Sequence, residues 1–217
     1  MTKIKMKIMG VMRNLKPKIN YQKKLEELVS TLEGKPTLLL HSCCGPCSTE
    51  VIDFLKDYFE ITVIYYNPNI EPYEEYLHRK SEQKRFIEEY KEAKIKFWDC
   101  DYDNEAFKKI AKGLEDAREG GARCNKCFYL RMKKAAEVAK ENNFEYFGTT
   151  LTVSPHKNSS MINEVGEYIS KECHIKYIYG DFKKNDGYKK SIEFSKLYNL
   201  YRQDYCGCLY GRSKIWS

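Results

Sequence analysis

The 217-residue sequence contains no hydrophobic run that approaches the roughly 18 residues needed to cross a bilayer, so we expect no membrane-spanning segment. No long apolar stretch follows its first lysines, which argues against a signal peptide and favours a cytoplasmic location. No G-x-G-x-x-G motif is present, so the usual signature of a dinucleotide site for a hydride donor is missing. Internal repeats and low-complexity tracts are also absent. With 42% hydrophobic and 32% charged residues, the composition indicates a globular protein.

Acidic residues are missing from the first 22 positions. Six cations lie there, at Lys3, Lys5, Lys7, Arg13, Lys16 and Lys18. They account for +6 of the formal net charge of +7, so the rest of the chain is nearly balanced. Such an arm suits a polyanion such as nucleic acid, and a solvated tail is the alternative interpretation. We therefore expect a basic extension over residues 1–20 and a single α/β catalytic domain over residues 21–217.

Apolar, β-branched runs alternate along the chain with segments of helical periodicity. The patterns predict five strands, over residues 36–42, 60–66, 94–100, 144–150 and 175–179. Helices are predicted over 25–34, 48–59, 73–93, 104–114, 124–142, 159–172 and 186–202. The strands are continuous apolar runs, as is typical of a sheet covered on both faces. This predicts a doubly wound α/β fold with a mainly parallel five-stranded sheet, whose ligands bind at the carboxyl ends of the strands.

Cysteine is abundant, with nine residues in a chain that shows no secretion signal. In a reducing compartment, clustered cysteines bind metal or perform redox chemistry more often than they form structural disulfides. Seven of the nine fall into three short clusters: Cys43, Cys44 and Cys47; Cys124 and Cys127; Cys206 and Cys208.

Seven thiols exceed the four that a tetrahedral zinc ion or a 4Fe–4S cluster requires. The three that remain suffice for a second metal or a redox pair. The C-x-x-C spacing of Cys124 and Cys127 suits zinc or iron–sulfur. Adjacent Cys43 and Cys44 favour a bulky cluster or two separate centres. The C-x-C pair, Cys206 and Cys208, is more plausible as a strained, labile disulfide.

Three other interpretations start from the same residues. A zinc ion that only holds loops together would give a zinc-stabilised RNA-binding module without catalysis. The sequence Cys44-Gly45-Pro46-Cys47, after a strand and before a helix, resembles a thioredoxin-type dithiol, but this leaves five clustered cysteines unexplained. The topology resembles PP-loop ATP pyrophosphatases, yet cysteines replace their phosphate-binding loop at residues 41–48, so we do not expect ATP binding.

Six motifs follow one another in a distinctive order: HSCCGPCS (41–48), YYNPNIEPYEEYLHR (65–79), DCDYDNEAF (99–107), GGARCNKCFYLRM (120–132), GTTLTVSPHKN (148–158) and YRQDYCGCLYG (201–211). This combination covers about residues 20–211 and resembles the QueH-type epoxyqueuosine reductases. The resemblance implies a fold related to the PP-loop and adenine nucleotide hydrolase-like (HUP) group. It implies reduction of epoxyqueuosine to queuosine at the wobble position of tRNA. It also implies a 4Fe–4S cluster without cobalamin, with Cys43, Cys44, Cys124 and Cys127 as ligands and Cys206 and Cys208 as a redox-active pair.

The residues agree with this chemistry. Turning an epoxide into an alkene removes one oxygen and consumes two electrons and two protons. Without a hydride site, the electrons come from thiolates, iron or an external donor. We therefore expect Cys47, Cys206 and Cys208 to form a second centre beside the cluster, either a metal site such as a mononuclear iron or a dithiol. Asp99, Asp101 and Asp204 are candidate proton donors near the cysteines, and Asp101 is also a candidate metal ligand.

The expected macromolecular partner is the anticodon loop of a tRNA that carries epoxyqueuosine. Unstacked RNA bases stack on aromatic rings, and the chain has 18 Tyr and 10 Phe. The tyrosines nearest the motif loops are Tyr65, Tyr66, Tyr73, Tyr76 and Tyr205. Hydroxyl and amine groups after the fourth strand are candidates to bind phosphate or the modified base, with helix capping as the alternative: Thr149, Thr150, Thr152, Ser154 and Lys157.

Overall fold

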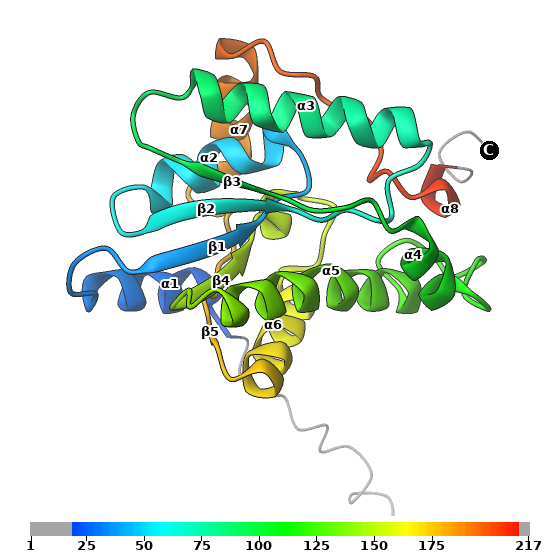
Figure 1. Ribbon diagram of the computed structural model, residues 1–217, viewed down its shortest axis with the longest axis horizontal. Helices are drawn as coiled ribbons and strands as arrows, with labels where there is room; N and C mark the ends of the chain where they lie inside the picture. The colour runs from blue at the N-terminus through cyan, green and yellow to red at the C-terminus, as the bar shows by residue number, and fades with distance from the viewer. Residues whose placement is uncertain (1–18, 213–217) are drawn as a thin grey trace, which may run out of the picture.

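The computed structural model describes residues 19–212 (Figure 1). The predicted basic extension therefore lies outside the described residues, apart from positions 19 and 20. The sheet has five strands: β1 (Thr37–His41), β2 (Glu60–Tyr65), β3 (Lys96–Asp99), β4 (Tyr146–Thr149) and β5 (Lys176–Tyr177). Their order is β3-β2-β1-β4-β5, and every pairing is parallel. The doubly wound α/β fold predicted from the sequence is confirmed.

Eight α-helices and one 3-10 turn connect and cover the strands in the described part of the chain. They are α1 (Tyr21–Ser30), α2 (Gly45–Leu55), α3 (Tyr73–Glu89), α4 (Asn104–Ala111), α5 (Ala122–Glu141), η1 (Leu151–Val153), α6 (Ser159–Cys173), α7 (Gly187–Leu197) and α8 (Leu209–Arg212). None of these described helices combines the length and apolar character required to span a membrane.

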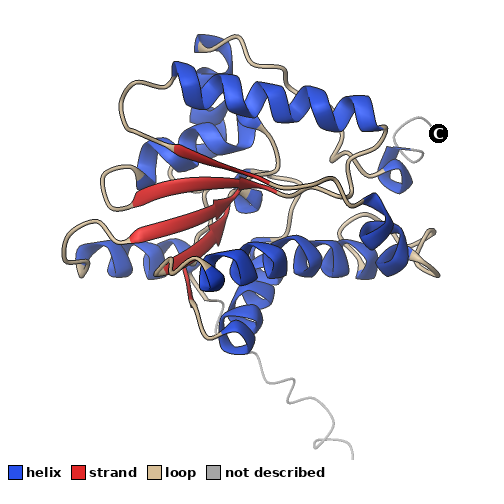
Figure 2. Cartoon of the chain, viewed as in Figure 1, coloured by secondary structure: helices blue, strands red, loops and turns tan. Residues whose placement is uncertain are grey.

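Two helical layers enclose the sheet, as Figure 2 shows. Successive residues of a strand point to opposite faces, so β1 contributes to both layers. Leu39 packs with residues of α5 and α6, including Met132. Leu38 and Leu40 pack instead with residues of α1, α2 and α3. Burial on both faces explains why the strands are continuous apolar runs.

Two predicted helix boundaries near the site are wrong. Helix α2 begins at Gly45, three residues before the predicted start, because Pro46 has a backbone angle suited to the first helical turn. Ser48 therefore lies inside the helix, where its hydroxyl donates to the Gly45 carbonyl at 2.8 Å. At the other end of the chain, α7 ends at Leu197 and not at 202, since Asn199 adopts a left-handed backbone conformation.

Candidate active site

The strand order creates a topological switch point between β1 and β4. The chain moves outward from β1 to β3 and then returns to β4 on the other side of β1. At such a point the loops separate and leave a crevice beyond the carboxyl ends of the strands. His41, the last residue of β1, places Nδ1 2.9 Å from the hydroxyl of Thr149 at the end of β4. Just beyond, the sulfur of Cys43 lies 3.9 Å from the hydroxyl of Thr150, so the first cysteines occupy the crevice.

Cys43, Cys44 and Cys47, hereafter the cysteine triad, form the tightest group of thiols. Their three sulfur atoms all lie within 4.8 Å of one another. Cys44 is the N-cap of α2, and Cys47 belongs to its first turn. A helix N-terminus favours negative charge, which stabilises thiolates over thiols. The triad therefore has the spacing and the electrostatic setting to hold a metal.

The three thiols do not titrate alike. Hydrogen bonds from Cys44 and Cys47 hold the pKa of Cys43 well below its usual range. Burial raises the pKa of Cys44 to about 12, and the hydrogen bond with Cys43 raises the pKa of Cys47. Cys43 is therefore the thiol of the triad that loses its proton most readily. Metal binding has to displace the remaining protons, because the thiolate is the ligand.

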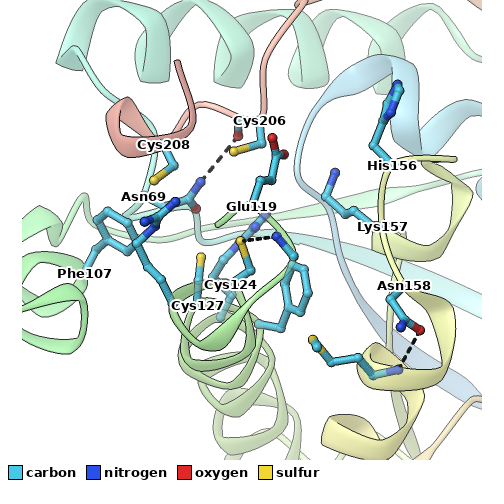
Figure 3. A pocket seen from close by; sticks show the side chains of 15 residues that line it. Asn69, Phe107, Glu119, Cys124, Cys127, His156, Lys157, Asn158, Cys206 and Cys208 are labelled. Carbon is cyan, nitrogen blue, oxygen red and sulfur yellow. Dashed lines mark hydrogen bonds between the residues drawn. The ribbon is translucent and has the colours of Figure 1, made fainter. Parts of the chain in front are cut away.

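Cys124, Cys127, Cys206 and Cys208 line a cavity of about 40 Å³ (Figure 3). The first two lie near the start of α5, and the other two end the irregular segment 201–208, hereafter the cysteine loop. Sites for small organic ligands measure about 300–1,000 Å³, so this cavity accepts an ion or a compact inorganic group.

Long-range contacts hold the cysteine loop in place. The amide of Asn69 donates to the Cys206 carbonyl at 3.4 Å, and the Glu71 N–H donates to the Gly207 carbonyl at 2.9 Å. Gly207 has a φ of 98°, and a Cβ there would lie 2.7 Å from Ile70, so the central residue of the C-G-C sequence has to be glycine. The amide of Gln203 reaches the sulfur of Cys44 at 2.8 Å, which joins the loop to the triad.

The C-x-C thiols are strongly differentiated. The hydrogen bond from Cys208 lowers the pKa of Cys206 to about 6, and the same interaction raises the pKa of Cys208. At neutral pH, Cys206 is therefore mostly a thiolate beside a protonated thiol. That is the protonation pattern of a dithiol prepared for thiol–disulfide chemistry.

Two cations connect the triad with the cavity. Arg131 is 3% exposed and lines the cavity one turn beyond Cys127; its Nη2 donates to Asn67, and its Nε has no hydrogen-bond partner within residues 19–212. Lys157, in the loop before α6, also lines the cavity, and its side chain points into it (Figure 3). Its positive charge favours the thiolate forms of Cys43 and Cys206 by lowering the pKa of each. The triad and the cysteine loop thus share one electrostatic environment.

Comparison with known proteins identifies the family. The family model described as epoxyqueuosine reductase QueH matches residues 38–214. The epoxyqueuosine reductase QueH of Staphylococcus epidermidis is 42% identical over 215 residues, which cover 95% of this chain and 90% of that protein. The protein of the same name from Thermotoga maritima is 31% identical, over 80% of this chain and 89% of the relative. The chain belongs to the QueH family. The resemblance seen in the six motifs is therefore confirmed.

In this QueH-family chain, all seven clustered cysteines gather at the carboxyl edge of the sheet, in the triad and around the cavity. Their division between a cluster and a second centre remains a prediction. The candidate proton donors lie elsewhere: Asp101 and Asp204 are exposed and do not line the cavity, and Asp99 is paired with Lys80 and Lys84. The roles of these aspartates also remain predictions.

Sequence reasoning missed two residues of the site, Arg131 and Gln203. Arg131 follows Cys127 by four residues in a predicted helix, and that spacing places two side chains on one face. The sequence therefore contained a signal that Arg131 lies beside Cys127. Gln203 had no comparable signal, because its contact with Cys44 joins positions 159 residues apart through an irregular segment.

Proposed function

We propose that this chain reduces epoxyqueuosine to queuosine at the wobble position of tRNA. The observation that carries the proposal is the convergence of three distant cysteine motifs, with two cations, on one crevice at the switch point of the sheet. A site built from soft sulfur donors suits electron transfer and iron, and membership of the QueH family specifies the substrate. A tRNA substrate also makes the cytoplasm the expected location.

The overall reaction defines what the site must supply. The epoxide loses its oxygen as water, and the two ring carbons become an alkene, which takes two electrons and two protons. The thiol-lined cavity is too small to admit the nucleoside. The epoxide therefore has to be presented at its mouth, where Lys157 offers a positive charge to the oxygen as negative charge develops on it.

Cys43, Cys44, Cys124 and Cys127 are the proposed ligands of a 4Fe–4S cluster. The donor set fits this group, because such clusters take four thiolates. The charge of Arg131 supports the grouping, because it favours the thiolate form of both Cys43 and Cys127. At Cys127 this effect counteracts desolvation, which raises the pKa of that thiol to about 11. A buried cation shared by Cys43 and Cys127 offsets the negative charge of a cluster held between them. When bound, the cluster supplies electrons one at a time.

Cys47, Cys206 and Cys208 are the proposed second centre. Lys157 lies within electrostatic reach of both parts of this grouping, because Cys47 and Cys206, like Cys43, favour its protonated form. As a dithiol, Cys206 and Cys208 would release two electrons and two protons on forming a disulfide, which matches the demand of the reaction. An external electron donor would then restore the thiols. As a metal site, the same sulfurs would hold a mononuclear iron.

Anaerobic purification followed by iron and sulfide quantification tests the cofactor, and incubation with epoxyqueuosine-containing tRNA and dithionite tests the reaction. We expect brown protein with about four irons per chain for the cluster alone, or about five if the second centre also holds a mononuclear iron. Nucleoside mass spectrometry should show conversion of epoxyqueuosine to queuosine. Colourless protein containing only zinc would support the RNA-binding module instead. Colourless, metal-free protein that reduces disulfides would support the thioredoxin-type alternative.

A further inference from the structure

A groove of about 960 Å³ lies beside the cysteine cavity and is distinct from it. Three parts of the fold form its described walls: the start of α1, the start of α6, and residues 181–185 between β5 and α7. Lys157 and Asn158 line both the groove and the cysteine cavity, so the two are contiguous. The groove is large enough for several linked groups of nucleotide size, whereas the cavity is not.

The charges along the groove are unbalanced in favour of cations. Asp181 is neutralised by Lys183, whose Nζ lies 2.6 Å away. Glu26 accepts hydrogen bonds from Gln22 and Asn185, each at 3.3 Å. The remaining charged groups of the described lining are all lysines: Lys23, Lys157 and Lys184. Lys23 is only weakly paired, at 3.7 Å from Glu27, which is outside the lining.

Backbone donors add to this positive character. The Asn158 side chain caps α6 by accepting the Met161 N–H at 3.2 Å. The N–H groups of Ser159 and Ser160 precede the first intrahelical hydrogen bond of this 15-residue helix, and both residues line the groove. Amides at a helix N-terminus, together with lysines, bind phosphate.

The described lining of the groove is continuous in sequence with the basic segment. Ile19 lines the groove, and the 18 residues before it carry six cations and no acid. Within the described lining, a polyanion that enters the groove would meet four lysines and two acidic residues. An acidic protein would meet the same charge, but RNA is favoured because Lys157 and Asn158 join the groove to the cavity at which the modified nucleotide has to react.

We propose that this groove binds the sugar–phosphate backbone of the RNA strand that flanks the modified nucleotide. Lys23, Lys184 and the start of α6 bind successive phosphates, and Lys157 stands where the strand passes from the groove to the mouth of the cysteine cavity. The inference rests on the proposed function, since it assumes a tRNA substrate. It adds the path of the RNA and the residues that bind it.

Binding of a fluorescent anticodon stem-loop RNA to the iron-loaded enzyme, measured by anisotropy over a salt series, tests the groove. Each phosphate contact contributes about 0.7 to the slope of log affinity against log salt for single-stranded nucleic acid. We expect Lys23→Glu/Lys184→Glu to weaken binding roughly 10-fold or more and to flatten the slope by about 1.4. Lys94→Glu is the matched control, because Lys94 is exposed and precedes β3, the opposite edge strand of the sheet. It should retain wild-type affinity and slope.

Equal RNA binding by the wild type, the double variant and Lys94→Glu would overturn the proposal. So would a double variant that binds RNA normally but accepts electrons more slowly from an acidic donor protein, since the groove would then bind that protein. Circular dichroism checks that the double variant is folded, and the single Lys184→Gln variant, which adds no negative charge, should show a smaller loss in the same direction. Failure of the proposed function looks different: the wild-type enzyme would leave epoxyqueuosine in tRNA unchanged, whatever the groove binds.

Discussion

The cysteine triad and the cysteine loop carry similar thiols but owe their positions to different parts of the fold. The triad follows a central strand directly and lies at the start of a helix, so regular secondary structure fixes it. The cysteine loop is irregular and is held by side chains and backbone groups of the β2–α3 segment, such as Asn69 and Glu71. One region is positioned by local structure and the other by distant contacts.

This difference matches the chemistry proposed for each region. Ligands of a cluster have to stay fixed, since a displaced ligand opens an iron site. A dithiol or a labile metal site has to move, because its sulfurs change partners during turnover. A segment with few regular hydrogen bonds can open locally without unfolding the sheet.

The largest expected effect separates the two regions by their cysteines. Cys43→Ala should bleach the protein and remove its iron and sulfide, because one cluster ligand is lost. Cys206→Ala should remain brown. Its turnover should fall by more than 100-fold, because loss of a residue that only contacts a metal ligand costs roughly 10- to 100-fold. Visible absorbance, iron content and the tRNA assay measure both outcomes.

Cys173→Ala is the control for these variants, since Cys173 is partly buried against the core at the end of α6 and belongs to none of the three groups of clustered cysteines. It should keep both colour and activity. If Cys206→Ala is colourless and Cys43→Ala stays brown, the division of the thiols proposed here is wrong.

The same difference explains what the sequence alone could predict. Strand periodicity was sufficient to predict the five-stranded parallel sheet, and in the structure Cys43, Asn67 and Thr150 lie just beyond the carboxyl ends of β1, β2 and β4. The start of α2 was placed too late because Gly45 and Pro46 were interpreted as loop residues. The contacts of the cysteine loop were not predictable, since they join residues more than 100 positions apart without any periodic pattern.

A smaller effect should follow when the cysteine loop loses its attachment to α3. Arg79 is 2% exposed, pairs with Glu75 at 2.7 Å, and donates to the Tyr205 carbonyl at 3.3 Å. Breaking a buried ion pair by removing one partner costs about 3–5 kcal/mol. Arg79→Met should lower the free energy of unfolding by about that amount and accelerate alkylation of Cys206 more than that of Cys44.

Urea unfolding and mass spectrometry of alkylated thiols measure these two changes. Lys171→Met is the matched control, because the pair of Lys171 with Glu167 is exposed and should contribute nothing measurable. Equal acceleration at Cys206 and Cys44 would show that Arg79 stabilises the whole domain and does not act selectively on the loop.

The smallest expected effect concerns pH. The backbone N–H of Tyr201, at the start of the cysteine loop, donates to the Glu82 carboxylate at 2.8 Å. By contrast, the N–H of Ser42, beside the triad, donates to the backbone carbonyl of Ile64 at 3.0 Å. A carboxylate titrates and a carbonyl does not. Acid should therefore loosen the start of the cysteine loop before it affects the attachment of the triad.

The sign follows from the pKa of Glu82, which its hydrogen bond with Arg85 lowers. A lowered pKa in the folded state contributes stability above the unfolded value of about 4.3, and that stability is lost as the pH falls through the folded value. Between about pH 5 and pH 3, hydrogen-exchange protection should drop at Tyr201 by about 1 kcal/mol relative to Ser42. Glu82→Gln should abolish this dependence, because its amide oxygen still accepts but does not titrate. Any acid effect on the cysteine site is common to both proteins, so an unchanged pH dependence in Glu82→Gln would exclude Glu82 as the cause.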